Sequence, residues 1–148
     1  MNGLSESRRL YTYINVTLSL LALLAGGFLY AIFRSDGAYM FNWFGNIGMV
    51  DYIYNLRDSI GAYPIESWVR YNLPASLWLL AYLFAIAAIW TGHKTSRWFY
   101  FFVWLMTFMS LATEILQLFE IIPGTFDVTD VLSYAIVTLA FFIINKYI

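Results

Sequence analysis

The 148-residue sequence contains no cysteine and a single histidine. The absence of cysteine excludes disulfide bonds, thiolate metal sites and cysteine nucleophiles. The lone histidine, His93, excludes a histidine-rich metal site, and its place beside Lys94 is typical of a solvated loop residue. We therefore expect no metal and no other cofactor, and we assign no catalytic residue.

Charged side chains are also scarce, at 11% of the sequence, whereas 61% is hydrophobic and 21% aromatic. Soluble domains are roughly 45–50% apolar and about 25% charged, so this chain lacks the polar surface to cover a globule. The net charge of -1 offers no basic face for nucleic acid. These features predict one all-α integral membrane domain over residues 1–148. Its expected partners are membrane lipids, with other membrane proteins or further copies of the chain as alternatives, and not nucleic acid.

Four segments are apolar enough to cross a bilayer, which takes about 20 mostly apolar residues. The predicted membrane helices cover residues 11–33, 73–91, 98–119 and 131–145. The first is longer than the apolar region of a cleaved signal peptide, and no small-residue cleavage site follows it. The sequence therefore predicts a four-helix membrane protein.

Basic residues predict the orientation of these helices, because lysine and arginine accumulate in cytoplasmic loops. The two terminal regions and the connection between the second and third helices share one acid, Glu6, and five basic residues: Arg8, Arg9, Lys94, Arg97 and Lys146. Most acidic residues, including Asp36, lie in the other two connections. Both termini are therefore predicted to be cytoplasmic.

The external connection, residues 34–72, is too long to be a simple link. Apolar residues recur in it at three- or four-residue intervals and predict a short interfacial helix over 47–60: Val50, Ile53, Leu56 and Ile60. Asp51, Arg57 and Asp58 are predicted to face elsewhere. Aromatic side chains nearby are typical of a belt at the headgroup level, and a lid over a polar pocket is the alternative: Trp43, Tyr52, Tyr54, Tyr63 and Trp68.

Acidic and amide side chains gather where the third predicted helix ends and the fourth begins. Glu114 lies about 24 Å along the third helix at 1.5 Å per residue, which places it in the outer leaflet. Gln117, at i+3, shares its helix face. A carboxylate there is unfavourable unless it is paired, protonated or in contact with water. Asp127 is predicted to cap the fourth helix, with Asp130 at the N3 position, close to a capping box.

Arg70 and Asn72 precede the second helix on the same side of the membrane. An Arg70–Glu114 or an Arg70–Asp127 pair would neutralise a carboxylate. A functional role and a satisfied interhelical hydrogen bond both remain open for Glu114. The predicted binding residues are Glu114, Gln117, Asp127, Asp130, Arg70 and Asn72.

The run Glu114-x-x-Gln117, followed by Pro123-Gly124-Thr125-Phe126-Asp127-x-x-Asp130, resembles the VanZ-like family. The motif Leu73-Pro74-x-x-Leu77-Trp78 resembles the short members of that family from Bacteroidetes. The resemblance implies a small bacterial four-helix protein of the cell envelope, in the cytoplasmic (inner) membrane. The sequence differs at Thr125, where members often carry arginine, and at Ser133 and Tyr134, where they carry asparagine and then glycine.

Functions of different classes remain open. The first is a cell-envelope protein whose outward-facing acidic cluster binds a lipid headgroup, a glycolipid or a cation. The second is a non-enzymatic anchor, sensor or accessory subunit of a larger membrane protein complex. Hydrolysis by a carboxylate pair is a third, because two acids with different pKa values can carry out acid–base chemistry. The balance favours a protein that is not an enzyme.

Overall fold

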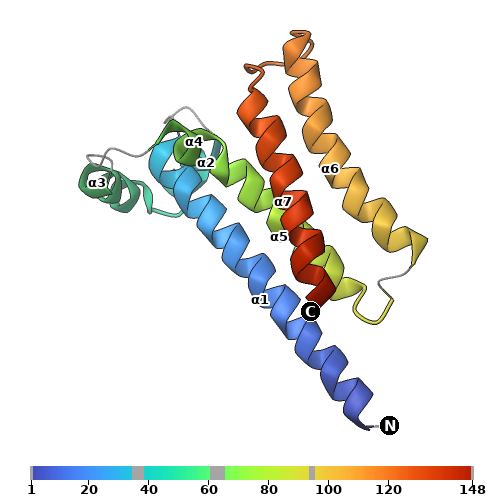
Figure 1. Ribbon diagram of the computed structural model, residues 1–148. Helices are drawn as coiled ribbons and strands as arrows, with labels where there is room; N and C mark the ends of the chain where they lie inside the picture. Colours follow the sequence, from blue (N-terminus) through green and yellow to red (C-terminus); the bar gives the residue numbers. More distant parts are fainter. Residues whose placement is uncertain (1, 35–38, 61–65, 94–95, 148) are drawn as a thin grey trace.

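The computed structural model describes residues 2–34, 39–60, 66–93 and 96–147, and this part of the chain is all-helical, without strands (Figure 1). Asp36, Tyr63 and Lys94 lie outside the described residues. The helices are α1 (Asn2–Phe33), α2 (Tyr39–Asn46), α3 (Val50–Ile60), α4 (Ser67–Tyr71), α5 (Leu73–Ile89), α6 (Arg97–Leu118) and α7 (Val128–Tyr147).

Within the described residues, three helices are long and apolar enough to cross a membrane: Glu6–Phe33 of α1, α6 and α7. The chain is therefore a multi-pass membrane protein. The helix α5, predicted over 73–91, ends at Ile89 and has 17 residues. At 1.5 Å per residue it is about 26 Å long, slightly shorter than a hydrocarbon core of about 30 Å.

Two membrane helices start earlier than their apolar segments. The helix α1 begins at Asn2 rather than at residue 11, because hydropathy marks the apolar part of a helix and not its polar first turns. The helix α7 begins at Val128 rather than Val131, directly after Asp127. The helix α6 begins at Arg97, where the hydroxyl of Ser96 accepts a 3.3 Å hydrogen bond from the Trp98 amide.

The helix α5 lies at the centre of the bundle. It packs against α1, against α6 and against α7, and Figure 1 shows α1 running antiparallel beside it. Buried residues occupy most of its circumference, and only the face with Trp78 and Ile89 is exposed. The buried residues are Pro74, Ser76, Leu79, Ala81, Leu83, Phe84, Ile86 and Ala87. A helix that is apolar on all sides is typical of a buried position, and α5 is the most apolar of the four long helices.

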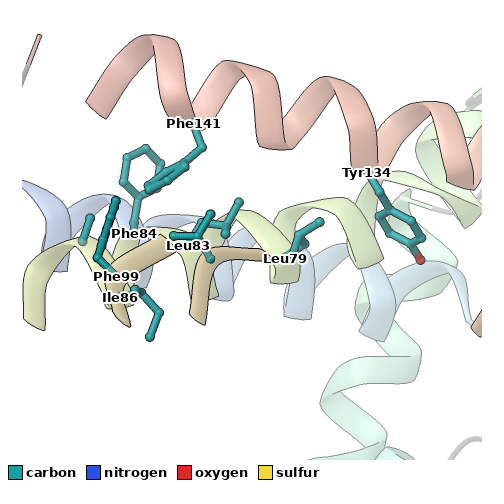
Figure 2. Packing of buried hydrophobic residues seen from close by; sticks show 9 residues of the cluster. Leu79, Leu83, Phe84, Ile86, Phe99, Tyr134 and Phe141 are labelled. Carbon is teal, nitrogen blue, oxygen red and sulfur yellow. The ribbon is translucent and has the colours of Figure 1, made fainter. Parts of the chain in front are cut away.

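The main hydrophobic core joins α5 to α6 and α7. Its side chains are Leu79, Leu83, Phe84, Ile86 and Ala87 of α5, Phe99 and Val103 of α6, and Tyr134 and Phe141 of α7. Figure 2 shows Phe141 reaching from α7 toward Phe84. Their ring centroids lie 5.4 Å apart at an interplanar angle of 75°, the edge-to-face geometry that aromatic pairs favour.

The connection between α1 and α5 folds back onto the C-terminal end of α1. Phe41 of α2 and Ile53 of α3 are buried against Ala31 of α1. The helix α3 starts at Val50 instead of the predicted Ile47, because the backbone turns at Gly48, where φ is 70°.

Arg57 does not face away from the protein as the sequence pattern predicts. Its Nε donates a 2.8 Å hydrogen bond to the carbonyl of Ala31, and its Nη2 donates to the carbonyl of Arg34. The guanidinium group also lies 4.3 Å from the centroid of the Phe41 ring. A cationic side chain on the last carbonyl groups of α1 complements the helix dipole, and it fixes α3 to the end of α1.

Gly26 allows α1 and α5 to approach closely. A Cβ atom at residue 26 would lie 2.8 Å from the Trp78 indole and 3.0 Å from the carbonyl oxygen of Pro74, whereas one at Gly27 would meet open space. Small residues give membrane helices such close contacts. Because the two helices are close, the hydroxyl of Ser19 in α1 donates a 2.8 Å hydrogen bond to the carbonyl of Ala81 in α5.

Replacement of Gly26 by alanine is expected to destabilise the protein by about 1–3 kcal/mol, because the added methyl group forces α1 away from α5. Gly27→Ala is the matched control. It should leave stability unchanged or raise it by up to about 1 kcal/mol, because alanine is the better helix former. Thermal unfolding of both variants in the same detergent checks the prediction. Equal effects at the two positions would contradict the packing described here.

Candidate functional site

A cavity of about 510 Å³ lies where the C-terminal ends of α1 and α6 meet the N-terminal ends of α5 and α7. Its polar lining comprises Glu114, Gln117, Asp127, Asp130, Arg34 and Arg70, and its aromatic lining Tyr30, Tyr71, Trp78 and Tyr134. Five of the six predicted binding residues therefore line one cavity. The sixth, Asn72, hydrogen-bonds Asp127.

The end of α6 directs the chain back toward the cavity. The amide of Glu120 donates to the carbonyl of Gln117, and the amide of Ile121 donates to that of Leu116, which is the hydrogen-bond pattern of a Schellman motif. Glu120 occupies its left-handed position with φ of 56°. This sharp end to α6 allows the following turn to fold back onto the same helix.

Gly124 closes this turn over Gln117. Its φ of 141° is one that side-chain-bearing residues rarely adopt. A Cβ atom at this position would lie 2.5 Å from the Gln117 amide nitrogen. The turn therefore packs on the helix face that carries Glu114 and Gln117, and it brings Asp127 back beside Glu114.

Asp127 caps α7, as the sequence predicts: its Oδ1 accepts a 2.7 Å hydrogen bond from the amide of Thr129. The other predicted contact of the capping box, from the Asp130 side chain to the Asp127 amide, is wrong. The amide of Asp127 does not bind the side chain of Asp130 but donates to Oε2 of Glu114, at 3.3 Å. Glu114 thus takes from α6 the place that Asp130 would hold in a capping box.

Asp130 is consequently left to line the cavity. Its Oδ1 is buried and has no hydrogen-bond partner in the described part of the chain. Glu114, only 4% exposed, brings a second carboxyl group to the same cavity. The two acids come from different helices, and both face the space that the turn encloses.

Asn72 connects this acidic cluster to the centre of the bundle. The side chain is 3% exposed, and its Nδ2 donates a 3.0 Å hydrogen bond to Oδ2 of Asp127. Nearby, the Trp68 indole of α4 donates to the hydroxyl of Ser133 in α7, at 3.1 Å. These two contacts hold the α4–α5 junction against the start of α7.

The pKa of Asp127 is lowered below its ordinary value, chiefly because the Asn72 amide donates a hydrogen bond to the carboxylate. The Thr129 side chain and amide add to this effect. Each donor favours the ionised form. Asp127 therefore acts as an ionised structural group whose two oxygens are both occupied.

The predicted Arg70–Glu114 and Arg70–Asp127 pairs are not formed. Arg70 lines the cavity, but among the described residues its buried Nε has no hydrogen-bond partner, and its guanidinium group lies 5.5 Å from the Phe33 ring. Asp127 instead accepts hydrogen bonds from Asn72 and from the Thr129 amide, and Glu114 accepts one from the Asp127 amide.

Arg34 and the aromatic part of the lining were not predicted from the sequence. Arg34 follows the last turn of α1, and its guanidinium group lies 5.6 Å from the Tyr30 ring. The predicted topology placed Arg34 on the same side of the membrane as the acidic residues, and this could have indicated that it lies near them. Tyr134, one of the departures from the VanZ-like pattern, also lines the cavity, as does Thr125.

Of the long external connection, only Arg34 and the α4 residues Arg70 and Tyr71 line the cavity within the described residues. Trp43 and Tyr52 of α2 and α3 are exposed, at 67% and 64%. An aromatic belt at the headgroup level stays a prediction for these two helices. A lid over the cavity also stays a prediction, and α4 is the helix of this connection that lines the cavity in the described residues.

No group of three or more acidic or histidine side chains in the described ranges is arranged to hold a metal ion. No family model, no curated protein and no solved structure matches the chain. The cavity is therefore the feature of the described residues that bears on function.

Asp127→Ala is expected to lower stability by about 1–2 kcal/mol through loss of the helix cap alone. Asp127→Asn separates the cap from the Asn72 contact, since asparagine also caps helices but its NH2 group cannot accept the hydrogen bond from Asn72. The lowered pKa adds a pH dependence: the carboxylate stabilises the fold fully above its unfolded pKa, and this contribution is lost as the pH falls through the folded pKa. The wild type should lose stability below pH about 4, and Asp127→Asn should lose less. Thermal unfolding between pH 3 and 7 measures this (range set by the ordinary pKa of about 3.9), and parallel curves would contradict the assignment.

Proposed function

We propose that the chain crosses the bacterial cytoplasmic membrane four times, with both termini in the cytoplasm and the cavity facing outward. The two ends of the chain and the α5–α6 connection lie toward one end of the bundle in Figure 1, and the cavity lies toward the other. At the first end, the Arg8 side chain packs on Gly92, so basic groups gather there. Burial of α5 among three spanning helices supports a fourth crossing despite its length.

The absence of cysteine makes this topology directly testable with single introduced cysteines. Glu6→Cys, Asp58→Cys, Glu120→Cys and Lys146→Cys each replace an exposed residue. In intact cells, a membrane-impermeant maleimide should label positions 58 and 120, and it should label 6 and 146 only after permeabilisation. Labelling of positions 6 and 146 from opposite sides would contradict the four-crossing topology.

We propose further that the protein is a VanZ-like cell-envelope protein whose cavity binds the polar headgroup of a membrane-borne molecule, a lipid or a glycolipid. The observation that carries this proposal is the buried, polar lining at one end of an apolar bundle. Pockets of roughly 300–1,000 Å³ with a few converging polar groups are typical ligand sites, and the 510 Å³ cavity falls in this range. Buried carboxyl groups inside a membrane protein also favour a ligand that compensates for them.

The double variant Glu114→Gln, Asp130→Asn tests this function while leaving the Asp127 cap in place. Both substitutions keep the side-chain volume and remove the acidic groups that face the cavity. Lipids that co-purify with the protein in mild detergent should decrease by about tenfold for the specific class, as expected for loss of a charged hydrogen bond. Asp51→Asn with Asp58→Asn, on exposed α3 positions, is the control. An unchanged lipid profile would argue against a binding cavity.

A second candidate, an accessory subunit of a membrane complex, is favoured by the outer face of α6. A hollow of about 530 Å³ is lined by residues of this helix alone, among them Phe101, Trp104 and Phe108. These three side chains are 41–61% exposed. If a partner helix covers this face, a stoichiometric partner should co-purify in mild detergent and should be lost in Trp104→Ala. A chain that purifies alone or as a homo-oligomer would weigh against this role.

A further inference from the structure

The cavity carries charges of both signs on different helices. Its acidic groups come from α6 and the start of α7, and its guanidinium groups come from the end of α1 and from α4. The helix α5 packs between α1 and the α6–α7 pair. The basic and acidic linings therefore come from different helices that meet around the N-terminal end of α5.

The acidic groups differ in how much of their hydrogen-bonding capacity the protein uses. Both oxygens of Asp127 are occupied, by Thr129 and by Asn72. Glu114 accepts one hydrogen bond, at 3.3 Å. Asp130 has a buried oxygen without any donor in the described part of the chain. Glu114 and Asp130 thus remain available to a ligand that brings N–H or O–H donors.

On the basic side of the cavity, a hydrogen-bond donor lacks an acceptor. The Nε of Arg70 is a buried donor with no acceptor among the described residues. Arg70 forms no ion pair with a described carboxylate, and Arg34 interacts with Asp130 through its charge without a direct ion pair. Each guanidinium group also lies over an aromatic ring. A buried polar atom without a hydrogen-bond partner is unfavourable. The Nε of Arg70 and the Oδ1 of Asp130 therefore both favour a ligand that supplies the missing partner.

We infer that the cavity binds a phosphoethanolamine group, with its ammonium on Glu114 and Asp130 and its phosphate on Arg70 and Arg34. This inference rests on the proposed binding function and specifies its ligand. An anionic ligand can offer Asp130 at most neutral O–H donors, which form weaker hydrogen bonds to a carboxylate than the N–H groups of an ammonium, and a purely cationic ligand leaves the donor on Arg70 unsatisfied. Guanidinium groups bind phosphate well because their N–H donors match its oxygens.

A primary ammonium fits the acidic side better than a quaternary one. The orphaned oxygen of Asp130 requires a hydrogen-bond donor, and a primary ammonium has three N–H bonds whereas a trimethylammonium has none. The chemistry therefore separates phosphoethanolamine from phosphocholine, although both are zwitterions. The group could belong to a phosphatidylethanolamine headgroup or to free O-phosphoethanolamine, and the experiment distinguishes these sources.

Native mass spectrometry of the full-length protein in detergent, titrated with lipids of matched acyl chains, provides the test. The probes are phosphatidylethanolamine, phosphatidylcholine and phosphatidylglycerol. The ethanolamine lipid should bind about tenfold more tightly than either of the others, the factor expected for one charged hydrogen bond. Equal binding of the three lipids would overturn the inference.

Variants locate the binding in the cavity. Arg70→Gln and Asp130→Asn should each weaken binding of the ethanolamine lipid by about tenfold or more. Their matched controls, Arg97→Gln and Asp58→Asn, change exposed residues away from the cavity and should bind like the wild type. Arg34→Gln, at an exposed side chain, keeps the test valid if Arg70→Gln does not fold. Equal losses in the cavity variants and the controls would contradict the assignment.

Two further outcomes separate this inference from the proposed function. If phosphatidylglycerol binds most tightly and the cavity variants weaken it, the zwitterion is wrong and a headgroup site stands. If no lipid and no free O-phosphoethanolamine responds to the cavity variants, both proposals fail. Displacement of the ethanolamine lipid by an equimolar amount of free O-phosphoethanolamine assigns the soluble source, and its retention assigns the lipid.

Discussion

The side chain and amide of Asp127 join three parts of the bundle at one point. The carboxylate accepts hydrogen bonds from Asn72 at the α4–α5 junction and from the first turn of α7, while the amide donates to Glu114 of α6. Without this junction, the turn after α6 would have no fixed position over the cavity. The polar lining therefore depends on a residue whose own oxygens are already occupied.

This arrangement divides the acidic residues by role. Asp127 is structural, whereas Glu114 combines a structural hydrogen bond with a place in the cavity, and Asp130 lines the cavity with an oxygen that has no donor in the described residues. These roles differ because Glu114 accepts the hydrogen bond from the Asp127 amide, which Asp130 would accept in a capping box. Three similar acids close together in sequence thus acquire three different environments.

The packing below the cavity explains why these polar groups are tolerated. Phe84, Phe99 and Phe141 are almost fully buried in the core that joins α5 to α6 and α7. Close to this core, the hydroxyls of Thr107 and Thr138 lie 3.3 Å apart between α6 and α7. A well-packed apolar bundle at one end provides stability that an incompletely satisfied polar cluster at the other end does not.

Hydropathy and residue type predicted the helical class, and they singled out acidic and amide residues most of which line one cavity. Glu114 stood out because a carboxylate within an apolar helix needs a reason, and the structure places it in the cavity with Gln117, Asp127 and Asp130. The hydrogen-bond partners were not predictable in the same way. Which side chain meets the Asp127 amide is decided by the turn after α6, whose path depends on the unusual backbone angles of Glu120 and Gly124.

Arg57 shows the same limit in a different element. Arg57 lies off the apolar face of α3, which predicted that it points away from the protein. Its side chain instead turns toward α1, because the carbonyl groups at the end of that helix accept its hydrogen bonds. Arg34 was missed because a single arginine at a helix end is unremarkable by itself, and only the folded chain brings it to the cavity. Tertiary contacts between distant segments determined both positions, and periodicity within one helix contains no information about them.

A double-mutant cycle between Asn72 and Asp127 tests the central claim most directly. Asn72→Ala, Asp127→Ala and the double variant would be unfolded reversibly in the same lipid–detergent mixture. A hydrogen bond to a charged group predicts a coupling free energy of about 1.5–3 kcal/mol between the two positions. Strictly additive effects would show that these side chains do not interact, and would contradict the account of how the cavity is held together.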